Sequence, residues 1–205
     1  MNIKKFVLVL LAFLITGTAH AEVSANLGFA SDYHYRGIFQ ASNSVNGGLD
    51  VQKNGFYAGT WAADVKDGLE VDGYFGYGRE IGQLAYSIGY TGYFYTGDFD
   101  DTYQEINLGG SYGLLALDVA VGEYDNFGGP TQNYTYYALT LEKSGFYGKY
   151  GGFSQDFAGE YFEAGFSTTI ADMAVGIAAI FANKELVGAS DESLVLTIGK
   201  SFDLK

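Results

Sequence analysis

VSANLGFASDYHYRGIFQ, residues 23–40, has the clearest strand pattern of the chain. Its residues divide into two faces in steps of two, because successive side chains of a β-strand point to opposite sides. The apolar face contains Val23, Ala25, Leu27, Phe29, Tyr33 and Tyr35, and only Ser31 interrupts it. The polar face contains Ser24, Asn26, Gly28, Ala30, Asp32, His34 and Arg36. The stretch predicts one long strand, and its two terminal tyrosines are typical of the aromatic collar on a membrane-spanning strand.

The first 21 residues have the features of a secretory signal peptide. Two lysines give a positive start, residues 6–15 form an uninterrupted apolar run, and 19–21 reads Ala-His-Ala, a small-x-small cleavage site. The apolar run is shorter than the roughly 20 residues that a spanning helix needs. A retained N-terminal anchor helix is the alternative. We expect the signal to be removed, so that residues 22–205 form a single barrel domain.

Composition narrows the class of protein. The 205 residues include 30 glycines, 18 tyrosines and 16 phenylalanines, with one proline (Pro130) and no cysteine. After the signal, no apolar run has the length of a membrane helix, so any membrane location would use strands. Loss of Lys4 and Lys5 leaves 9 basic against 24 acidic residues, a net charge of −15. This balance argues against a nucleic-acid partner, which would require basic patches.

The remaining chain has twelve segments with strand-like alternation and no convincing helix. The predicted strands are 23–38, 44–53, 55–65, 69–79, 83–95, 102–112, 114–123, 134–143, 145–155, 160–170, 172–182 and 192–202. The third and ninth alternate less regularly, because Gly and Tyr occur on both of their faces. Ten or fourteen strands are the alternative counts.

The connections between these segments alternate in length. The connections after even-numbered segments are short turns: 54–55, 80–82, 113, 143–145 and 171–172. Those after odd-numbered segments are mostly longer and more acidic, and include 97–101, 123–133 and 183–191. Tight turns at one end and longer loops at the other are typical of outer-membrane barrels. We therefore expect both termini at the periplasmic end and the acidic loops outside.

Alternation by itself does not say which face is inside. A soluble β-sandwich or a lipocalin-like barrel also alternates, with the apolar face inward. Here the polar faces are rich in Gly, Ser, Thr and Asn, as a confined lumen requires, and Tyr and Phe occur near strand ends. Together with the signal peptide, these features favour an all-β, antiparallel transmembrane β-barrel in a Gram-negative outer membrane, with its apolar faces in contact with lipid.

Four segments resemble a known family: SDYHYRGI at 31–38, GGLD at 47–50, GFYAGTW at 55–61 and EVDGYFGY at 70–77. They are similar to the TorF-like porin family, an uncharacterised bacterial outer-membrane family of the Gcw_chp type. The resemblance is dense in the first half of the chain and rests on strand rhythm in the second. It implies passive transport of small solutes. Similarity to outer-membrane proteins in general also implies a C-terminal aromatic residue recognised by the barrel assembly machinery, and Phe202 fits that role.

On this phasing, one set of charged residues faces the interior. The predicted pore-lining residues are Asp32, His34, Arg36, Asp50, Glu70, Asp72, Glu105, Asp118, Lys149 and Glu163. Acids outnumber bases among them, and rings of carboxylates favour cations, so we expect a mildly cation-preferring ion channel. The alternative is that the two bases pair with carboxylates and fill the interior. Twelve strands lie between the filled eight-stranded barrel and the open pore of about 16 strands.

Other functions have weaker support in the sequence. After signal cleavage His34 is the only histidine, so no more than one histidine-based catalytic centre is available, and we expect no enzyme. Asp98, Asp100 and Asp101 form an acidic loop that is a weak candidate for Ca²⁺, without EF-hand spacing. A receptor or adhesin role for the outer loops is a separate alternative. We expect no metal and no cofactor, and the oligomeric state stays open.

Overall fold

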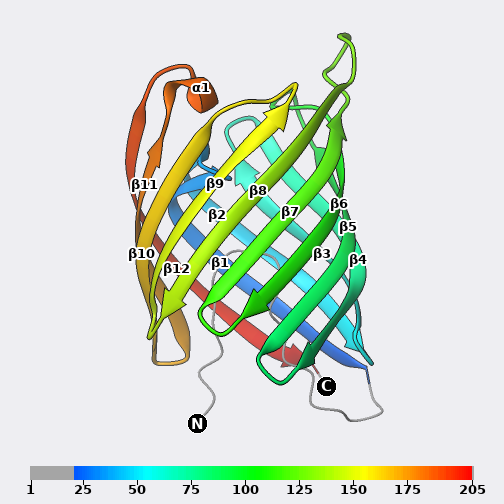
Figure 1. The fold of residues 1–205 in the computed structure, drawn as a ribbon, viewed down its shortest axis with the longest axis vertical. Helices are drawn as coiled ribbons and strands as arrows, with labels where there is room; N and C mark the ends of the chain where they lie inside the picture. The colour runs from blue at the N-terminus through cyan, green and yellow to red at the C-terminus, as the bar shows by residue number, and fades with distance from the viewer. Residues whose placement is uncertain (1–20, 205) are drawn as a thin grey trace.

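A computed structural model describes residues 21–204. Twelve antiparallel strands form one closed barrel, in which each strand pairs with its neighbours in sequence and β12 pairs with β1 (Figure 1). The strands are β1 (Glu22–Tyr35), β2 (Ile38–Lys53), β3 (Phe56–Val65), β4 (Gly68–Ile81), β5 (Leu84–Tyr95), β6 (Tyr103–Tyr112), β7 (Leu115–Tyr124), β8 (Gln132–Lys143), β9 (Phe146–Gln155), β10 (Glu160–Ile170), β11 (Met173–Ala182) and β12 (Asp191–Leu204). The predicted twelve-stranded antiparallel barrel is confirmed, including the third and ninth strands. The predicted signal peptide lies almost wholly outside the described residues.

The apolar faces of the strands form the outside of the barrel. Leu27, Ile88 and Leu194 are 61%, 53% and 65% exposed, whereas the polar residues Thr91 and Glu105 are almost completely buried. This is the reverse of a soluble sandwich or lipocalin-like barrel, which would bury its apolar face. Within residues 21–204, no helix is long and apolar enough to span a membrane.

The predicted difference between the two ends is also present. At the end where β1 begins and β12 ends, five tight turns join the strand pairs (Figure 1). Two of these turns, Asn54–Gly55 and Ser144–Gly145, have positive φ at both residues, 52° and 89° in the first and 53° and 86° in the second. These are the dihedrals of type I′ hairpins, which match the twist of paired strands. We call this the turn end and the opposite one the loop end.

The first connection at the loop end differs from the prediction. The predicted first strand ran to residue 38 and was followed by a loop over 39–43, but β1 ends at Tyr35 and β2 begins at Ile38. Arg36 and Gly37 form a two-residue turn with φ of 50° and 83°. The prediction was wrong because the polar residues after this turn belong to a bent strand, which simple alternation does not identify.

The last connection at the loop end contains a helix that the sequence did not predict. The one-turn helix α1 (Lys184–Val187) interrupts the loop between β11 and β12. The side chain of Asn183 accepts a hydrogen bond from the Leu186 N–H at 3.0 Å and so caps the helix. Asn is a strong N-cap residue, and this local bond is sufficient for a single turn.

An aromatic core fills the interior near the loop end. It includes Tyr134, Tyr136, Phe153, Tyr161 and Ile180, all of which lie toward the loop ends of their strands. Toward the turn end, the interior holds small and polar residues, as where Ser87 faces Gly109, and a few tyrosines whose rings lie over glycines, such as Tyr57 over Gly76 and Tyr147 over Gly165. The two halves of the lumen therefore differ in how they are filled.

Candidate functional site

The tip of the β1–β2 hairpin leaves the wall of the barrel. The ladder between β1 and β12 stops at the Ala30–Thr197 pair, although β12 continues toward the loop end. The ladder between β2 and β3 stops at the Asn46–Ala63 pair. Residues 31–42 therefore have no ladder pairs with either neighbouring strand, and we call them the inserted hairpin. In Figure 1 its tip, in blue, lies within the outline of the barrel.

A kink turns the hairpin inward. On β1, Ala30 and Tyr33 are both buried although they are three residues apart, so the alternation shifts by one residue between them. On β2, Ala41 and Ser44 show the same shift, and Asn43 between them has φ of 57°. Asn tolerates this left-handed conformation better than most residues. The kink thus exchanges the inner and outer faces of the hairpin beyond it.

The predicted aromatic collar at Tyr33 and Tyr35 is wrong. Tyr33 is only 7% exposed, and its hydroxyl donates a 2.6 Å hydrogen bond to Oε1 of Glu70. The ring of Tyr35 packs edge-on against Tyr93, with 5.4 Å between ring centroids. Both tyrosines point into the barrel because the kink precedes them. Ser31, which interrupts the predicted apolar face, lies at the kink.

The turn of the inserted hairpin holds a buried ion pair. Arg36 donates two hydrogen bonds to the Glu105 carboxylate, of 2.8 Å from Nη1 and 2.6 Å from Nη2. Glu105 also accepts hydrogen bonds from Tyr93 (2.7 Å), Tyr134 (2.9 Å) and the Asn107 amide (2.6 Å). The paired carboxylate offsets part of the cost of burying the charged guanidinium.

Aromatic rings enclose the same guanidinium. The Cζ atom of Arg36 lies 4.0 Å from the ring centroid of Tyr136 on the wall and 4.8 Å from that of Tyr35 on the hairpin. Both distances are within the range of cation–π attraction. The next residue, Gly37, packs so closely on Tyr161 that an added Cβ would lie 2.5 Å from the ring atom Cγ. The tip of the hairpin therefore fits the lumen only with a glycine at this position.

Two more carboxylates lie on β4 near this ion pair. Glu70 accepts hydrogen bonds from Tyr33 at 2.6 Å and from Tyr95 at 3.1 Å. Asp72 is 7% exposed, and its Oδ1 atom is buried without a hydrogen-bond partner. The charges of Glu70, Glu105 and Arg36 all act on Asp72. The structure thus brings together four of the predicted residues at the inserted hairpin.

Four other predicted residues lie in the interior beyond this group. Asp50 accepts a 2.6 Å hydrogen bond from Tyr74. Lys149 on β9 forms an ion pair with Glu163 on β10, with 3.6 Å between Nζ and Oε2. Asp118 on β7 is half-buried and pairs across the sheet with a glycine of β6. Both interior bases, Arg36 and Lys149, therefore pair with carboxylates.

Asp32 and His34 lie apart from this interior group. Asp32 accepts a 2.8 Å hydrogen bond from Ser42 across the hairpin, in an exposed position. Nε2 of His34 lies 3.2 Å from the hydroxyl of Ser193 on β12. Because alternation places these two residues opposite Tyr33 and Tyr35, they face away from the aromatic core. Ser193 shares the inward face of β12 with the buried Val195, so His34 lies between the hairpin and the wall.

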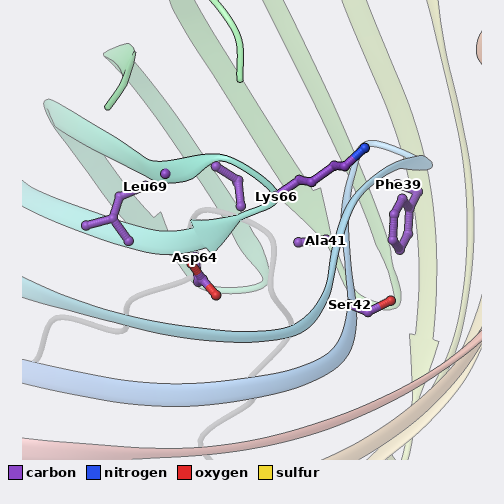
Figure 2. Close-up of a pocket in the computed structure, with 8 residues that line it drawn as sticks. Phe39, Ala41, Ser42, Asp64, Lys66 and Leu69 are labelled. Atoms are coloured by element: carbon purple, nitrogen blue, oxygen red, sulfur yellow. The ribbon is translucent and has the colours of Figure 1, made fainter. Parts of the chain in front are cut away.

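A pocket opens where the hairpin leaves the wall (Figure 2). Its volume is about 650 Å³, and its lining mixes apolar and charged side chains. The lining residues are Phe39, Ala41, Ser42, Asp64, Val65, Lys66, Gly68 and Leu69. Figure 2 shows Lys66 extending from the β3–β4 turn toward the tip of the hairpin.

The acidic loop considered for Ca²⁺ is tied to neighbouring strands. Asp100 accepts hydrogen bonds from the hydroxyls of Tyr103 and Tyr124, at 3.0 Å and 2.8 Å. Asp101 accepts one from the Phe127 N–H at 2.6 Å. Within residues 21–204, no group of three or more His, Cys, Asp or Glu residues is arranged to hold a metal ion.

Sequence reasoning missed the interior tyrosines as functional residues. Tyr93, Tyr134 and Tyr136 position or enclose the Arg36–Glu105 pair. A signal for the first of them was present, because Tyr93 lies two residues after Thr91 and so shares its polar face. Tyrosine was interpreted as a lipid-facing residue, and its hydroxyl makes it equally suited to a polar interior.

Comparisons with known proteins bear on the fold and the family. A solved structure from work on the in-meso crystallisation of membrane proteins superposes with a TM-score of 0.59 at 10% identity, covering 89% of this chain and 84% of the other. OccK1 (OpdK) of Pseudomonas aeruginosa gives a TM-score of 0.43 at 12% identity and covers 80% of this chain and 57% of its own. A BenF-like porin from Pseudomonas fluorescens Pf-5 gives 0.42 at 10% identity, covering 86% of this chain and 58% of its own.

The likeness at a TM-score of 0.59 extends over most of both chains and shows the fold. No curated protein matches the sequence. Residues 15–148 match the family described as "Bacterial protein of unknown function (Gcw_chp)". This match covers more than half of the sequence and includes all of the segments on which the resemblance was based. The chain is therefore a member of the Gcw_chp family of bacterial proteins.

Proposed function

We propose that the protein is an outer-membrane channel through which small solutes or ions diffuse, as its resemblance to TorF-like porins implies. The observation that carries this proposal is how the lumen is closed. Toward the turn end the interior combines small and polar side chains with a few tyrosines, whereas at the loop end an aromatic core of the wall closes around one hairpin that has left it. An apolar exterior around a polar interior suits a barrel in a bilayer. Movement of the inserted hairpin would open the channel.

The same proposal gives the barrel an orientation and a route to the membrane. The first 21 residues would direct export, and the loop end would face the cell exterior. Phe202 lies on the outward face of β12 and is 41% exposed, where the assembly machinery could recognise it. The partners we propose are outer-membrane lipid, the assembly machinery and the transported solute.

Charge in the lumen supports a preference for cations. The interior carboxylates are Asp50, Glu70, Asp72, Glu105, Asp118 and Glu163, against the bases Arg36 and Lys149. Both bases are neutralised by ion pairs, so four carboxylates remain without a basic partner. Carboxylates along a pore favour the entry of cations.

A specific observation favours a second candidate function. The aromatic core and the inserted hairpin fill the loop end of the lumen in this structure. A barrel that stayed in this state would not conduct, and its role would be structural or would lie in binding at its outer surface. This candidate is distinguished from a channel by conductance.

The decisive experiment measures conductance of the refolded protein in a planar bilayer under a salt gradient. Heat-modifiable mobility on a gel would first establish that the barrel has folded. Discrete steps with a reversal potential on the cation side would support the channel and its acidic lumen. A folded protein that never conducts would refute the channel and favour the non-conducting barrel.

A charge swap tests the lumen itself. Replacing Asp72 and Asp118 with Lys should move the reversal potential toward anions, because both carboxylates face the interior. The matched control replaces Asp172 and Glu185, which are exposed and lie outside the strands, and it should leave the reversal potential nearly unchanged. An equal shift in both variants would mean that the surface charge of the protein, rather than its lumen, sets the preference.

A further inference from the structure

We propose that Arg36 occupies a binding site for organic cations, and that a solute carrying a guanidinium or primary ammonium group takes its place. This inference rests on the proposed channel function and names a class of solute for it. The inference is drawn from one feature of the structure. The guanidinium of Arg36, which the bent hairpin carries, fills a cage of side chains from the wall of the barrel.

The wall supplies most of the cage. Glu105 and Asn107 are on β6, Tyr93 is on β5, and Tyr134 and Tyr136 are on β8. Tyr93, Tyr134 and Asn107 all hold the Glu105 carboxylate, and the Tyr136 ring lies over the bound guanidinium. The hairpin adds only Arg36 itself and the ring of Tyr35. Since these wall residues lie on paired strands, the cage persists when the hairpin moves.

An empty cage would be electrostatically unfavourable. Glu105 is 2% exposed, and its donors other than Arg36 are neutral groups. Departure of Arg36 would leave a buried carboxylate without a counter-ion, which is strongly destabilising. A second cation bound there would remove this cost. A guanidinium suits this carboxylate best, because its planar fork donates two parallel hydrogen bonds to the two oxygens. An ammonium group suits it less well, because it acts as a point charge.

A second observation indicates that the site favours positive charge. Asp72 is nine-tenths buried close to the ion pair, and its Oδ1 atom has no hydrogen-bond partner. The charges of Glu70 and Glu105 also act on Asp72, so a single arginine faces three carboxylates. Because its Oδ1 atom lacks a donor, Asp72 offers a hydrogen-bond acceptor to a cation bound at this site.

The hairpin is attached in a way that permits exchange. Residues 31–42 pair with each other but have no ladder pairs with β3 or β12. Their displacement breaks side-chain contacts and leaves the twelve-stranded wall intact. A solute cation and Arg36 then compete for one site. The apparent affinity for the solute is its intrinsic affinity multiplied by the fraction of time for which Arg36 has left the site.

Binding to the refolded protein in detergent tests the inference without requiring conductance. The probe is arginine amide, which carries a guanidinium and no carboxylate, and the method is isothermal titration calorimetry. Arg36→Gln should bind the probe at least about tenfold more tightly than the wild type, because the tethered competitor is gone. Arg36→Gln combined with Glu105→Gln should lose that gain. Arg36→Gln combined with Asp172→Asn should keep it, because Asp172 is exposed in a turn at the opposite end of the barrel.

The outcomes separate this inference from the channel function. If folded Arg36→Gln binds the probe no more tightly than the wild type, or if loss of Glu105 has no effect on binding, the inference is overturned. If Arg36→Gln fails to fold, Arg36→Lys replaces it, and its single-point ammonium should compete less well and give intermediate affinity. Equal affinity of Arg36→Lys and the wild type would also overturn the inference. Tight binding by a protein that never conducts would support the cage and refute the channel.

Discussion

At the scale of single residues, tyrosine explains how so many acids are accommodated inside this barrel. Glu70 accepts hydrogen bonds from Tyr33 and Tyr95, and Glu105 accepts them from Tyr93 and Tyr134. Two acids nearer the turn end, Asp50 and Glu163, also have tyrosine donors. A tyrosine ring fills space while its hydroxyl stabilises a carboxylate, so few cations are needed. The abundance of tyrosine therefore serves the interior as well as the outer surface.

Asp72 is the exception, and it gives a prediction. Its carboxylate is buried with an unpartnered oxygen, whereas Glu70 two residues earlier has two donors. An acid buried in this way costs free energy whether it stays ionised or takes up a proton, so Asp72→Asn should raise the free energy of unfolding by about 1–2 kcal/mol. The matched variant Glu70→Gln should lower it, because it weakens two charge-assisted hydrogen bonds. Urea unfolding in lipid vesicles would measure both; a loss of stability in Asp72→Asn would contradict the assignment.

The choice of outer and inner faces gives a second prediction at this scale. Ile88 is 53% exposed on the outside of β5, and its neighbour Ser87 faces the interior near Asp118. An arginine on the lipid face near the bilayer midplane costs about 2–4 kcal/mol. Ile88→Arg should therefore reduce the heat-modifiable fraction after refolding into vesicles, whereas Ser87→Arg should refold like the wild type. Equal yields for the two variants would show that the faces are assigned wrongly.

At the scale of the elements, the strands and the turns were predictable because each has a local cause. Alternation requires only neighbouring residues, and Asn54–Gly55 specifies its own hairpin through positive φ at both residues. The short helix α1 escaped prediction because one cap at Asn183 and four residues give no helical period. The bend of the β1–β2 hairpin escaped for another reason. It depends on Arg36 meeting Glu105, a residue 69 positions away, and alternation contains no such information.

One turn departs from the preferred sequence and predicts a stabilising change. Ala171 and Asp172 join β10 to β11 with φ of 48° and 62°, without a glycine or asparagine. The left-handed conformation costs most residues roughly 1–2 kcal/mol each, and type I′ turns prefer Asn-Gly. Replacing the pair with Asn-Gly should raise the free energy of unfolding by about 1 kcal/mol, measured by urea unfolding. Installing Ala-Asp at 54–55 is the reverse control and should lower it by at least as much, because a Cβ at position 55 would also lie 2.7 Å from Cε2 of Tyr77.

At the scale of the whole molecule, the inserted hairpin supplies what a barrel of this size lacks. Eight strands enclose a space that side chains fill, and about 16 strands leave an open channel. Here the side chains of the wall and residues 31–42 fill the loop end together, and Gly37 of the hairpin packs against Tyr161 on β10. Alternation along β1 predicted an inward face for Asp32 and His34, but it contains no information on the hairpin that carries them away from the wall.

If the inserted hairpin closes the lumen, a change that expels its tip should open the channel. A side chain at Gly37 would place its Cβ 2.5 Å from Tyr161 Cγ and 2.7 Å from its Cβ, which the closed hairpin cannot accommodate. Gly37→Val should therefore increase the open fraction in planar bilayers by about tenfold or more. The turn residue Gly82 also has positive φ, but nothing lies within 4 Å of its added Cβ, so Gly82→Val strains a turn without touching the lumen.

A compensating change separates the effect of the contact between position 37 and Tyr161 from the effect of backbone strain at position 37. Tyr161→Gly removes both the ring and the Cβ that a residue at 37 would meet, so Gly37→Ala together with Tyr161→Gly should conduct less than Gly37→Ala alone. Gly82→Val should match the wild type in conductance even if it is less stable, because its turn lies at the opposite end. If folded Gly37→Val and Gly82→Val conduct equally, expulsion of the hairpin does not open the barrel. Closure would then have to reside in the aromatic side chains of the wall, which Tyr136→Ala would test next by the same measurement.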